Sequence, residues 1–245
     1  MLRKTPFIET EFYHLYNRGN NKRSIFVDNR DRDRFVKLLY LCNRDRQIVY
    51  KEYESKPLHE LVEEFKNDEP LVAIGAYCLM PNHFHIFVKE IMENGISTFM
   101  QKFATAYSMY FNKRNAHSGT LFEGRFKSSH VKNDNYLKYL FAYIHLNPIK
   151  LIDSHWKESG VEDLEGAKRF LDTYIYSSYL DYCSHDRPEK AILARGEFPE
   201  YFETVREFKD FIHDWLAFSD EEAGDEEDET SDVETPKELT PVAVI

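Results

Sequence analysis

The chain has 245 residues, of which 42% are hydrophobic and 15% aromatic, so it can bury a core for one sizeable domain with additions. Its net charge is −11, but residues 220–245 hold eleven acidic residues and one lysine, so the other 219 residues together carry only −1. Its three cysteines include no CxxC pair, which argues against a disulfide framework or a cysteine zinc site. No signal segment stands at the start, and the longest apolar run has ten residues, too short to span a bilayer. We therefore expect a cytoplasmic protein with no membrane partner.

The first half of the chain predicts a strand, a helix and a hairpin of two strands. Residues 12–16 are aromatic and β-compatible, and Asp28 or Asn29 can cap a helix that extends to about Cys42. Residues 44–70 are charged and irregular, with a short helix at 58–65, and we interpret them as an insertion or connector. Residues 71–80 and 83–89 predict antiparallel strands joined by a tight turn at Pro81 and Asn82.

The second half completes a recognisable order of elements. Ser97 can cap an amphipathic helix to about Arg114, residues 125–131 predict a strand, and Asn133 or Asp134 can cap a helix that ends before Pro148. Strand, helix, strand, strand, helix, strand is the order of the ferredoxin-like split βαβ fold, an α+β fold with an antiparallel sheet. The predicted divisions are a domain at 1–150 with one added helix, a helical extension at 151–218 and an acidic tail at 219–245, whose composition predicts disorder.

A His-hydrophobic-His triplet lies in the second strand of the hairpin. Side chains alternate between the faces of a strand, so His83 and His85 share one face while Phe84, Ile86 and Val88 point the other way. Two neutral imidazoles side by side on a rigid strand can supply half of a metal site. The structural alternative, a pair of histidines that bind no metal, stays open on this triplet alone.

The helix before Pro148 can supply the other half. Tyr143 and Asn147 are spaced i and i+4, so they lie on one helical face. An amide oxygen with two imidazoles suits Mg²⁺ or Mn²⁺, which makes His83, His85 and Asn147 the predicted ligands.

The phenol of Tyr143 would lie one turn from that amide, where it can attack a phosphate as a nucleophile. Lys138 or Lys150 could serve as a basic neighbour. The alternative is again structural, because Tyr143 also fits an ordinary core stripe and Asn147 can simply end the helix.

Longer motifs around these residues carry a family resemblance. The segments CLMPNHFH at 78–85 and YIHLNPIK at 143–150 resemble the motif pair of the single-tyrosine transposases with a His-hydrophobic-His (HUH) motif, in particular the branch called REP-associated tyrosine transposases. Shorter matching segments are HLYNRG at 14–19, GTLFEGRFK at 119–127 and SSYLDY at 177–182.

The resemblance implies a metal-dependent endonuclease and strand transferase with the split βαβ fold. Such a protein acts on single-stranded DNA near hairpins, through a 5′-phosphotyrosine intermediate, as a homodimer or a monomer. Carried over by motif, His83 and His85 would bind the metal, Asn147 would be the third ligand, and Tyr143 would be the nucleophile. A nucleoid-associated location follows from the same resemblance.

Charge indicates where DNA would bind. Residues 101–150 hold eight Lys or Arg and two acidic residues, a balance that suits a polyanionic partner. The acidic tail could mimic DNA and compete for these positive charges. The candidate phosphate contacts are Arg18, Lys102, Lys113, Arg114, Arg125 and Lys127.

Two other functions fit parts of the same pattern. One is a non-catalytic DNA-hairpin-binding regulator that retains the transposase fold, which would bind hairpins without metal and without cleavage. The other is a replication or mobilisation initiator. The order of motifs disfavours it, because Tyr143 follows the histidine motif here and the nucleophile usually precedes it there.

Overall fold

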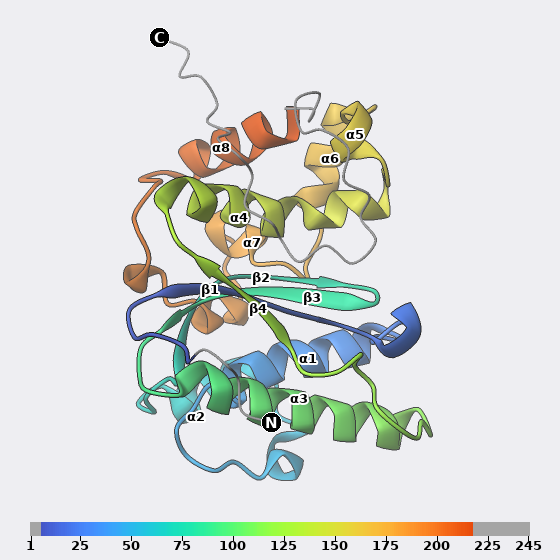
Figure 1. Cartoon of the computed structure of the whole chain (residues 1–245), viewed down its shortest axis with the longest axis vertical. Helices are drawn as coiled ribbons and strands as arrows, with labels where there is room; N and C mark the ends of the chain where they lie inside the picture. The colour runs from blue at the N-terminus through green and yellow to red at the C-terminus, as the bar shows by residue number, and fades with distance from the viewer. Residues whose placement is uncertain (1–5, 218–245) are drawn as a thin grey trace.

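The structure is a computed structural model that describes residues 6–217, so the predicted acidic tail at 219–245 lies outside the described residues. A single sheet lies in the middle with helices layered on both of its faces (Figure 1). Within 6–217, no helix combines the length and apolar character needed to cross a membrane.

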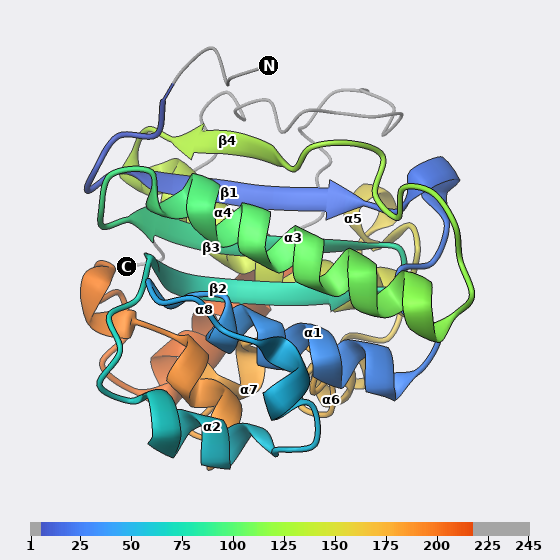
Figure 2. The same ribbon diagram turned by 90° about the horizontal axis from the view of Figure 1, so that it is seen from below.

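The sheet has the predicted ferredoxin-like arrangement. Its strand order is β2-β3-β1-β4, and all neighbouring strands are antiparallel (Figure 2). The α+β prediction is therefore confirmed. The strands are β1 (Phe12–Arg18), β2 (Val72–Met80), β3 (His83–Glu90) and β4 (Lys127–Val131).

One face of the sheet is covered by α1 (Asn29–Leu41) and α3 (Gly95–Arg114), with α2 (Leu58–Phe65) beside them (Figure 2). Helix α1 begins at the predicted cap, where the Asp28 carboxylate accepts the backbone N–H groups of Arg30 and Asp31. Helix α3 begins earlier than predicted.

The cap of α3 is Asn94 rather than Ser97. The Glu90 carboxylate accepts the backbone N–H of Ile96 at 2.7 Å, so a side chain at the end of β3 satisfies one of the first amides of the helix. Because this acceptor belongs to β3 and not to the residues next to the helix, local sequence preferences predicted the wrong first residue for α3.

The opposite face carries α4 (Asp134–Leu146), α5 (Trp156–Ser159), α6 (Leu164–Leu171), α7 (Tyr179–Tyr182) and α8 (Val205–Ala217) (Figure 1). Asn133 caps α4 as predicted, through its side-chain oxygen and the backbone N–H of Tyr136 at 2.8 Å. The described residues also form short 3-10 helices, which are η1 (Asn20–Lys22), η2 (Tyr50–Tyr53), η3 (Asn147–Leu151), η4 (Pro188–Ile192) and η5 (Arg195–Glu197).

Each face of the sheet has its own apolar core. Phe84, Ile86 and Val88 of β3 belong to the core beneath α1 and α3, whereas Phe87 belongs to the core beneath α4. The predicted alternation along β3 is thus confirmed, and His85 lies on the α4 face. The α4 layer is therefore the one that can complete a site with the histidines.

Strand β2 is buried along its whole length because its outer edge is also covered. The backbone N–H of Leu79 donates to Tyr176 O at 3.0 Å, and that of Ser178 donates to Tyr77 O at 3.0 Å. Gly75 allows a ring to approach this strand, since a Cβ there would lie 2.6 Å from Phe198. Residues beyond 150 therefore stabilise the sheet that carries the histidines, through hydrogen bonds and packing on β2.

Candidate functional site

A recess of about 760 Å³ opens where β1 ends and β2 turns into β3. Its walls come from these strand ends, the 123–127 segment, α4 and η3. Among the predicted site residues, those that line it are His83, His85, Tyr143, Arg18, Arg125 and Lys127. The fold thus gathers residues from four separate parts of the sequence.

The nucleophile candidate and the two histidines lie side by side within one chain. The ring centroids of His83 and His85 are 5.0 Å apart, and those of His85 and Tyr143 are 5.3 Å apart, edge to face. Tyr143 is half-buried, so its ring contacts the histidines while its side chain borders the recess.

His14 belongs to the same cluster, although sequence reasoning gave it no role. Its side chain is fully buried, and its Nε2 lies 2.8 Å from His85 Nδ1. In the register of β1 and β3, Tyr16 is opposite His85, which brings His14 diagonally beside it. His14 is the first residue of the HLYNRG segment, which the sequence already singled out. Its place beside His85 follows only once β1 and β3 are known to be neighbouring strands.

A hydrogen bond fixes the tautomer of His83, and a second one restricts that of His85. The side-chain oxygen of Asn82 lies 2.7 Å from His83 Nδ1, and an oxygen can only accept there, so the lone pair of His83 lies on Nε2. His85 Nε2 is buried and has no hydrogen-bond partner within the described residues. If His85 Nδ1–H donates to His14, its lone pair also lies on Nε2, as a metal ligand requires.

Burial keeps these imidazoles neutral. Burial, followed by the nearby His83, lowers the pKa of His14 to about 3. Burial and then the charges of His83 and His14 hold the pKa of His85 well below its usual range. The neutral imidazole is the form that binds metal ions, so burial favours the ligating form of His85.

Asn147 is the predicted third ligand, and its buried side-chain amide forms no hydrogen bond within the described residues. It is 1% exposed, and neither its side-chain oxygen nor its nitrogen has a hydrogen-bond partner within the described residues. It does not line the recess. Over residues 6–217 there is no group of three or more His, Cys, Asp or Glu side chains placed to hold a metal. The predicted donors are therefore two imidazole nitrogens and one amide oxygen, a set whose chemistry suits Mn²⁺ or Mg²⁺.

Other tyrosines are less well placed as nucleophiles. Tyr107 lies in α3 on the far face of the sheet, and its hydroxyl donates to Ile25 O at 2.6 Å. Tyr136 is a buried residue in the first turn of α4, and burial raises its pKa. Tyr139 lies outside the recess, with its ring centroid 6.0 Å from that of Tyr143.

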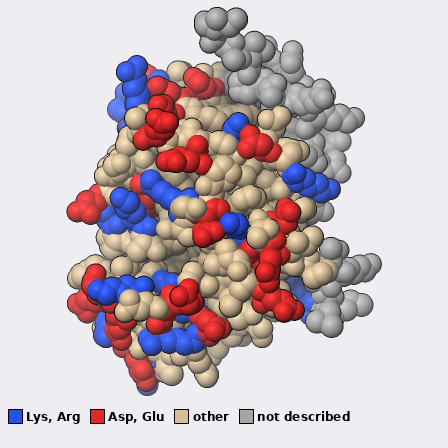
Figure 3. All heavy atoms as spheres, turned by 90° about the vertical axis from the view of Figure 1, so that its left-hand side faces the viewer, with Lys and Arg blue, Asp and Glu red and all other residues tan. Residues whose placement is uncertain are grey.

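The recess is basic. Lys22 and Lys150 line it together with Arg18, Arg125 and Lys127, and Glu123 is the one acidic residue among its lining residues. The face at the left of Figure 1, away from the β2–β3 turn, shows intermixed acidic and basic side chains instead (Figure 3).

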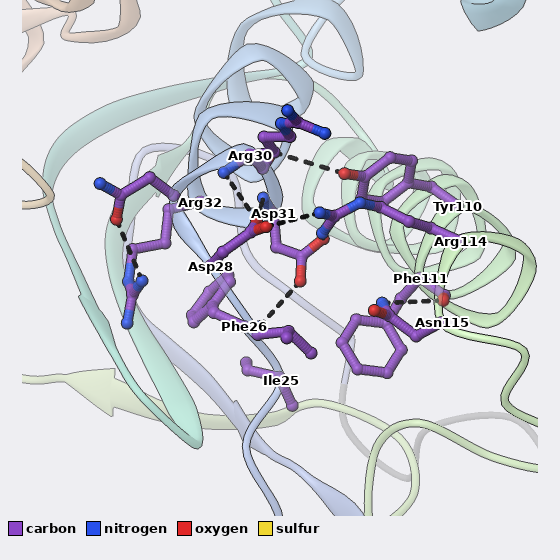
Figure 4. A network of polar contacts seen from close by, with 12 residues as sticks. Ile25, Phe26, Asp28, Arg30, Asp31, Arg32, Tyr110, Phe111, Arg114 and Asn115 are labelled. Atoms are coloured by element: carbon purple, nitrogen blue, oxygen red, sulfur yellow. Dashed lines mark hydrogen bonds and ion pairs between the residues drawn. The ribbon is translucent and has the colours of Figure 1, made fainter.

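Three predicted DNA contacts do not line this recess. Lys102 donates to the backbone oxygens of Arg44 and Arg46 in the α1–α3 layer, the latter at 3.0 Å. Lys113 is exposed near the end of α3 but is not among the lining residues. Arg114 forms ion pairs with Asp28 at 2.6 Å and Asp31 at 2.5 Å (Figure 4). Lys138, the other suggested base, is paired with Asp134 at 2.8 Å and also lies outside the recess.

The Arg114 network predicts a structural role. Asp31 is fully buried, and its second oxygen accepts the backbone N–H of Val27 at 2.8 Å. We expect Asp31→Ala to lower the free energy of unfolding by about 2 kcal/mol, because the Val27 N–H and the Arg114 guanidinium both lose the buried carboxylate that they pair with. Arg114→Ala should lower the melting temperature without weakening DNA binding, as measured by thermal unfolding and hairpin titration. A loss of DNA affinity in folded Arg114→Ala would restore it as a DNA contact.

The sheet, the paired imidazoles and the basic recess are those of a transposase-type DNA-binding protein. Residues 12–147 match the family model described as "Transposase IS200 like", and the chain belongs to this family. The matched segment runs from the first residue of β1 to the residue after α4, and so includes both histidines and Tyr143.

Two solved structures are similar to this chain at low scores. One, described as the REP-associated tyrosine transposase bound to a REP hairpin, has a TM-score of 0.42 and 14% identity, and the match covers 84% of this chain and 93% of that one. The other, tRNA(His) guanylyltransferase from Saccharomyces cerevisiae, has a TM-score of 0.35 and 10% identity, with 83% and 85% covered. Both scores are too low to bear on function. No curated protein matches the chain.

Proposed function

We propose that this protein is a metal-dependent endonuclease and strand transferase for single-stranded DNA, of the REP-associated branch, which cuts near hairpins through a 5′-phosphotyrosine. The observation that carries the proposal is the position of Tyr143, 5.3 Å from the His85 ring, in a recess lined by arginines and lysines. The hairpin preference rests on the motifs at 78–85 and 143–150.

The chemical step is a phosphoryl transfer to tyrosine. The hydroxyl oxygen of Tyr143 forms a bond to phosphorus as the bond from phosphorus to the 3′ oxygen breaks. The phenol proton leaves to water in the recess, and the 3′ oxygen takes up a proton to become a hydroxyl. In the reverse step a 3′-hydroxyl attacks the phosphotyrosine and Tyr143 departs, so rejoining needs no external energy source.

His83 and His85 would hold a divalent metal through Nε2, and Asn147 would do so through its amide oxygen. When bound, the metal neutralises charge on the reacting phosphate. The protein's own part is to present two neutral imidazoles whose Nδ1 atoms are engaged by Asn82 and His14. A ligand set fixed in advance by hydrogen bonds loses less entropy when the metal binds.

The basic wall of the recess would position the DNA backbone. Arg18, Lys22, Arg125 and Lys127 line it on the side of β1 and β4. Such contacts bind phosphates and fix the register of the strand, without reading its sequence. Because Tyr143 and both histidines come from one chain, we infer that one copy suffices for the chemistry, and that a homodimer would serve another purpose.

The test is the capture of a covalent intermediate. The protein is incubated with Mg²⁺ or Mn²⁺ and a labelled single-stranded hairpin from its own genomic flank. The expected products are a protein–DNA adduct, seen by denaturing gel and mass spectrometry, and a fragment with a free 3′-hydroxyl, with neither formed in EDTA. Metal-independent hairpin binding without an adduct would favour the regulator instead.

The acidic tail should weaken DNA binding. It follows α8, whose Trp215 ring lies 5.7 Å from Tyr139, the neighbour of Tyr143 on α4. Deletion of residues 220–245 removes a net charge of −10 and should tighten hairpin binding several-fold at low salt, with a smaller gain at high salt. A tail of equal length with its acids changed to amides is the control and should give the same gain. Unchanged affinity in both variants would contradict the mimicry.

A further inference from the structure

We infer that Lys157 is a positioning residue for Tyr143, and that it holds a positive charge against the ring of the nucleophile. Its Nζ lies 4.2 Å from the centroid of the Tyr143 ring. Lys157 is ten residues beyond the segment that matches the family model, so the helical extension adds a group that the matched segment lacks. This inference rests on the proposed function.

The fold holds Lys157 in place through its neighbour. Trp156 is 5% exposed and belongs to the core beneath α4, so it anchors the short helix α5. The chain returns toward α4 after η3, where the backbone N–H groups of Ile152 and Asp153 both donate to Ile149 O. The next residue after the anchor, Lys157, is half-buried and lies over the Tyr143 ring.

A cation in this position stabilises the transition state more than it stabilises the resting state. It attracts the negative face of a neutral aromatic ring, and more strongly where both groups are shielded from water. As the phenol oxygen loses its proton and attacks, negative charge spreads into the ring, and the attraction grows. Stabilisation that is larger in the transition state than in the resting state accelerates the step. The same charge assists the departure of Tyr143 in rejoining.

The test compares single-turnover rates in full-length protein. At saturating hairpin DNA with Mn²⁺, Lys157→Gln should slow both adduct formation and rejoining by roughly tenfold, with hairpin affinity unchanged within about twofold. Lys157→Arg should restore most of the rate, because a guanidinium can also lie over an aromatic ring. Lys168→Gln is the matched control, since Lys168 lies on α6 and pairs with Glu165 at 2.8 Å. It should leave both rates unchanged.

Several outcomes would overturn the inference. A Lys157→Gln variant that loses DNA affinity but keeps its saturated rate would make Lys157 a phosphate contact. Equal losses in the Gln and Arg variants, with a lower melting temperature, would make its role structural. Wild-type rates in Lys157→Gln would remove any role, while the proposed function stands. If the wild type itself forms no adduct, the proposed function fails and this inference fails with it.

Discussion

Tyr143→Phe should abolish the covalent protein–DNA adduct while hairpin affinity stays unchanged. The substitution removes one oxygen and retains the ring, so the contacts with His85, Tyr139 and Lys157 can persist. Without that oxygen no phosphotyrosine can form at this position, and the single-turnover rate should fall by at least about a thousandfold. Denaturing gels measure the adduct, and a hairpin titration measures the affinity.

Tyr139→Phe is the matched control for this experiment. It removes the same atom from the same helix, one turn away, from a residue that does not line the recess. We expect a wild-type level of adduct from it. An adduct that survives Tyr143→Phe would contradict the assignment and direct attention to Tyr16, the other tyrosine that lines the recess.

The second large effect should come from the histidine pair. His85→Ala removes a buried nitrogen that has no hydrogen-bond partner within the described residues, and His83→Ala removes the imidazole beside it. Each variant should bind Mn²⁺ at least about 100-fold more weakly, by calorimetry or by the free-ion paramagnetic resonance signal. Each should also lose adduct formation, because the phosphate is no longer neutralised.

His130→Ala controls for the loss of any histidine near the sheet. His130 lies on β4 and pairs with Glu11 at 2.9 Å, outside the recess lining. Its Mn²⁺ affinity and adduct yield should match those of the wild type. Unchanged Mn²⁺ affinity in both His83→Ala and His85→Ala would contradict the metal assignment, even if cleavage were lost.

The elements that sequence reasoning predicted well are those with local causes. The alternation along β3 follows from strand geometry, and the caps Asp28 and Asn133 lie next to the helices they begin. Such features need no knowledge of distant contacts.

The parts that escaped prediction depend on residues far apart in the chain. His14 joins the site only because β1 pairs with β3, 71 residues away. Arg114 looked like a DNA contact by charge alone, but Asp31 lies 83 residues before it and forms an ion pair with it. Lys157 reaches Tyr143 only because α5 folds back over α4. Charge counts and periodicity carry no information about such pairings.

The hydrogen bond between His14 and His85 ties the chemistry of the site to the alignment of two strands. A slip of one residue between β1 and β3 would turn His14 to the other face and place Tyr13 or Leu15 beside His85. Leu15 has no polar side-chain atom and Tyr13 carries its hydroxyl on a longer side chain, so neither reproduces the 2.8 Å contact that His14 makes with His85. If His83 and His85 hold a metal as proposed, correct pairing of β1 and β3 is required for its binding, and Mn²⁺ affinity would report whether the strands of a variant keep their native register.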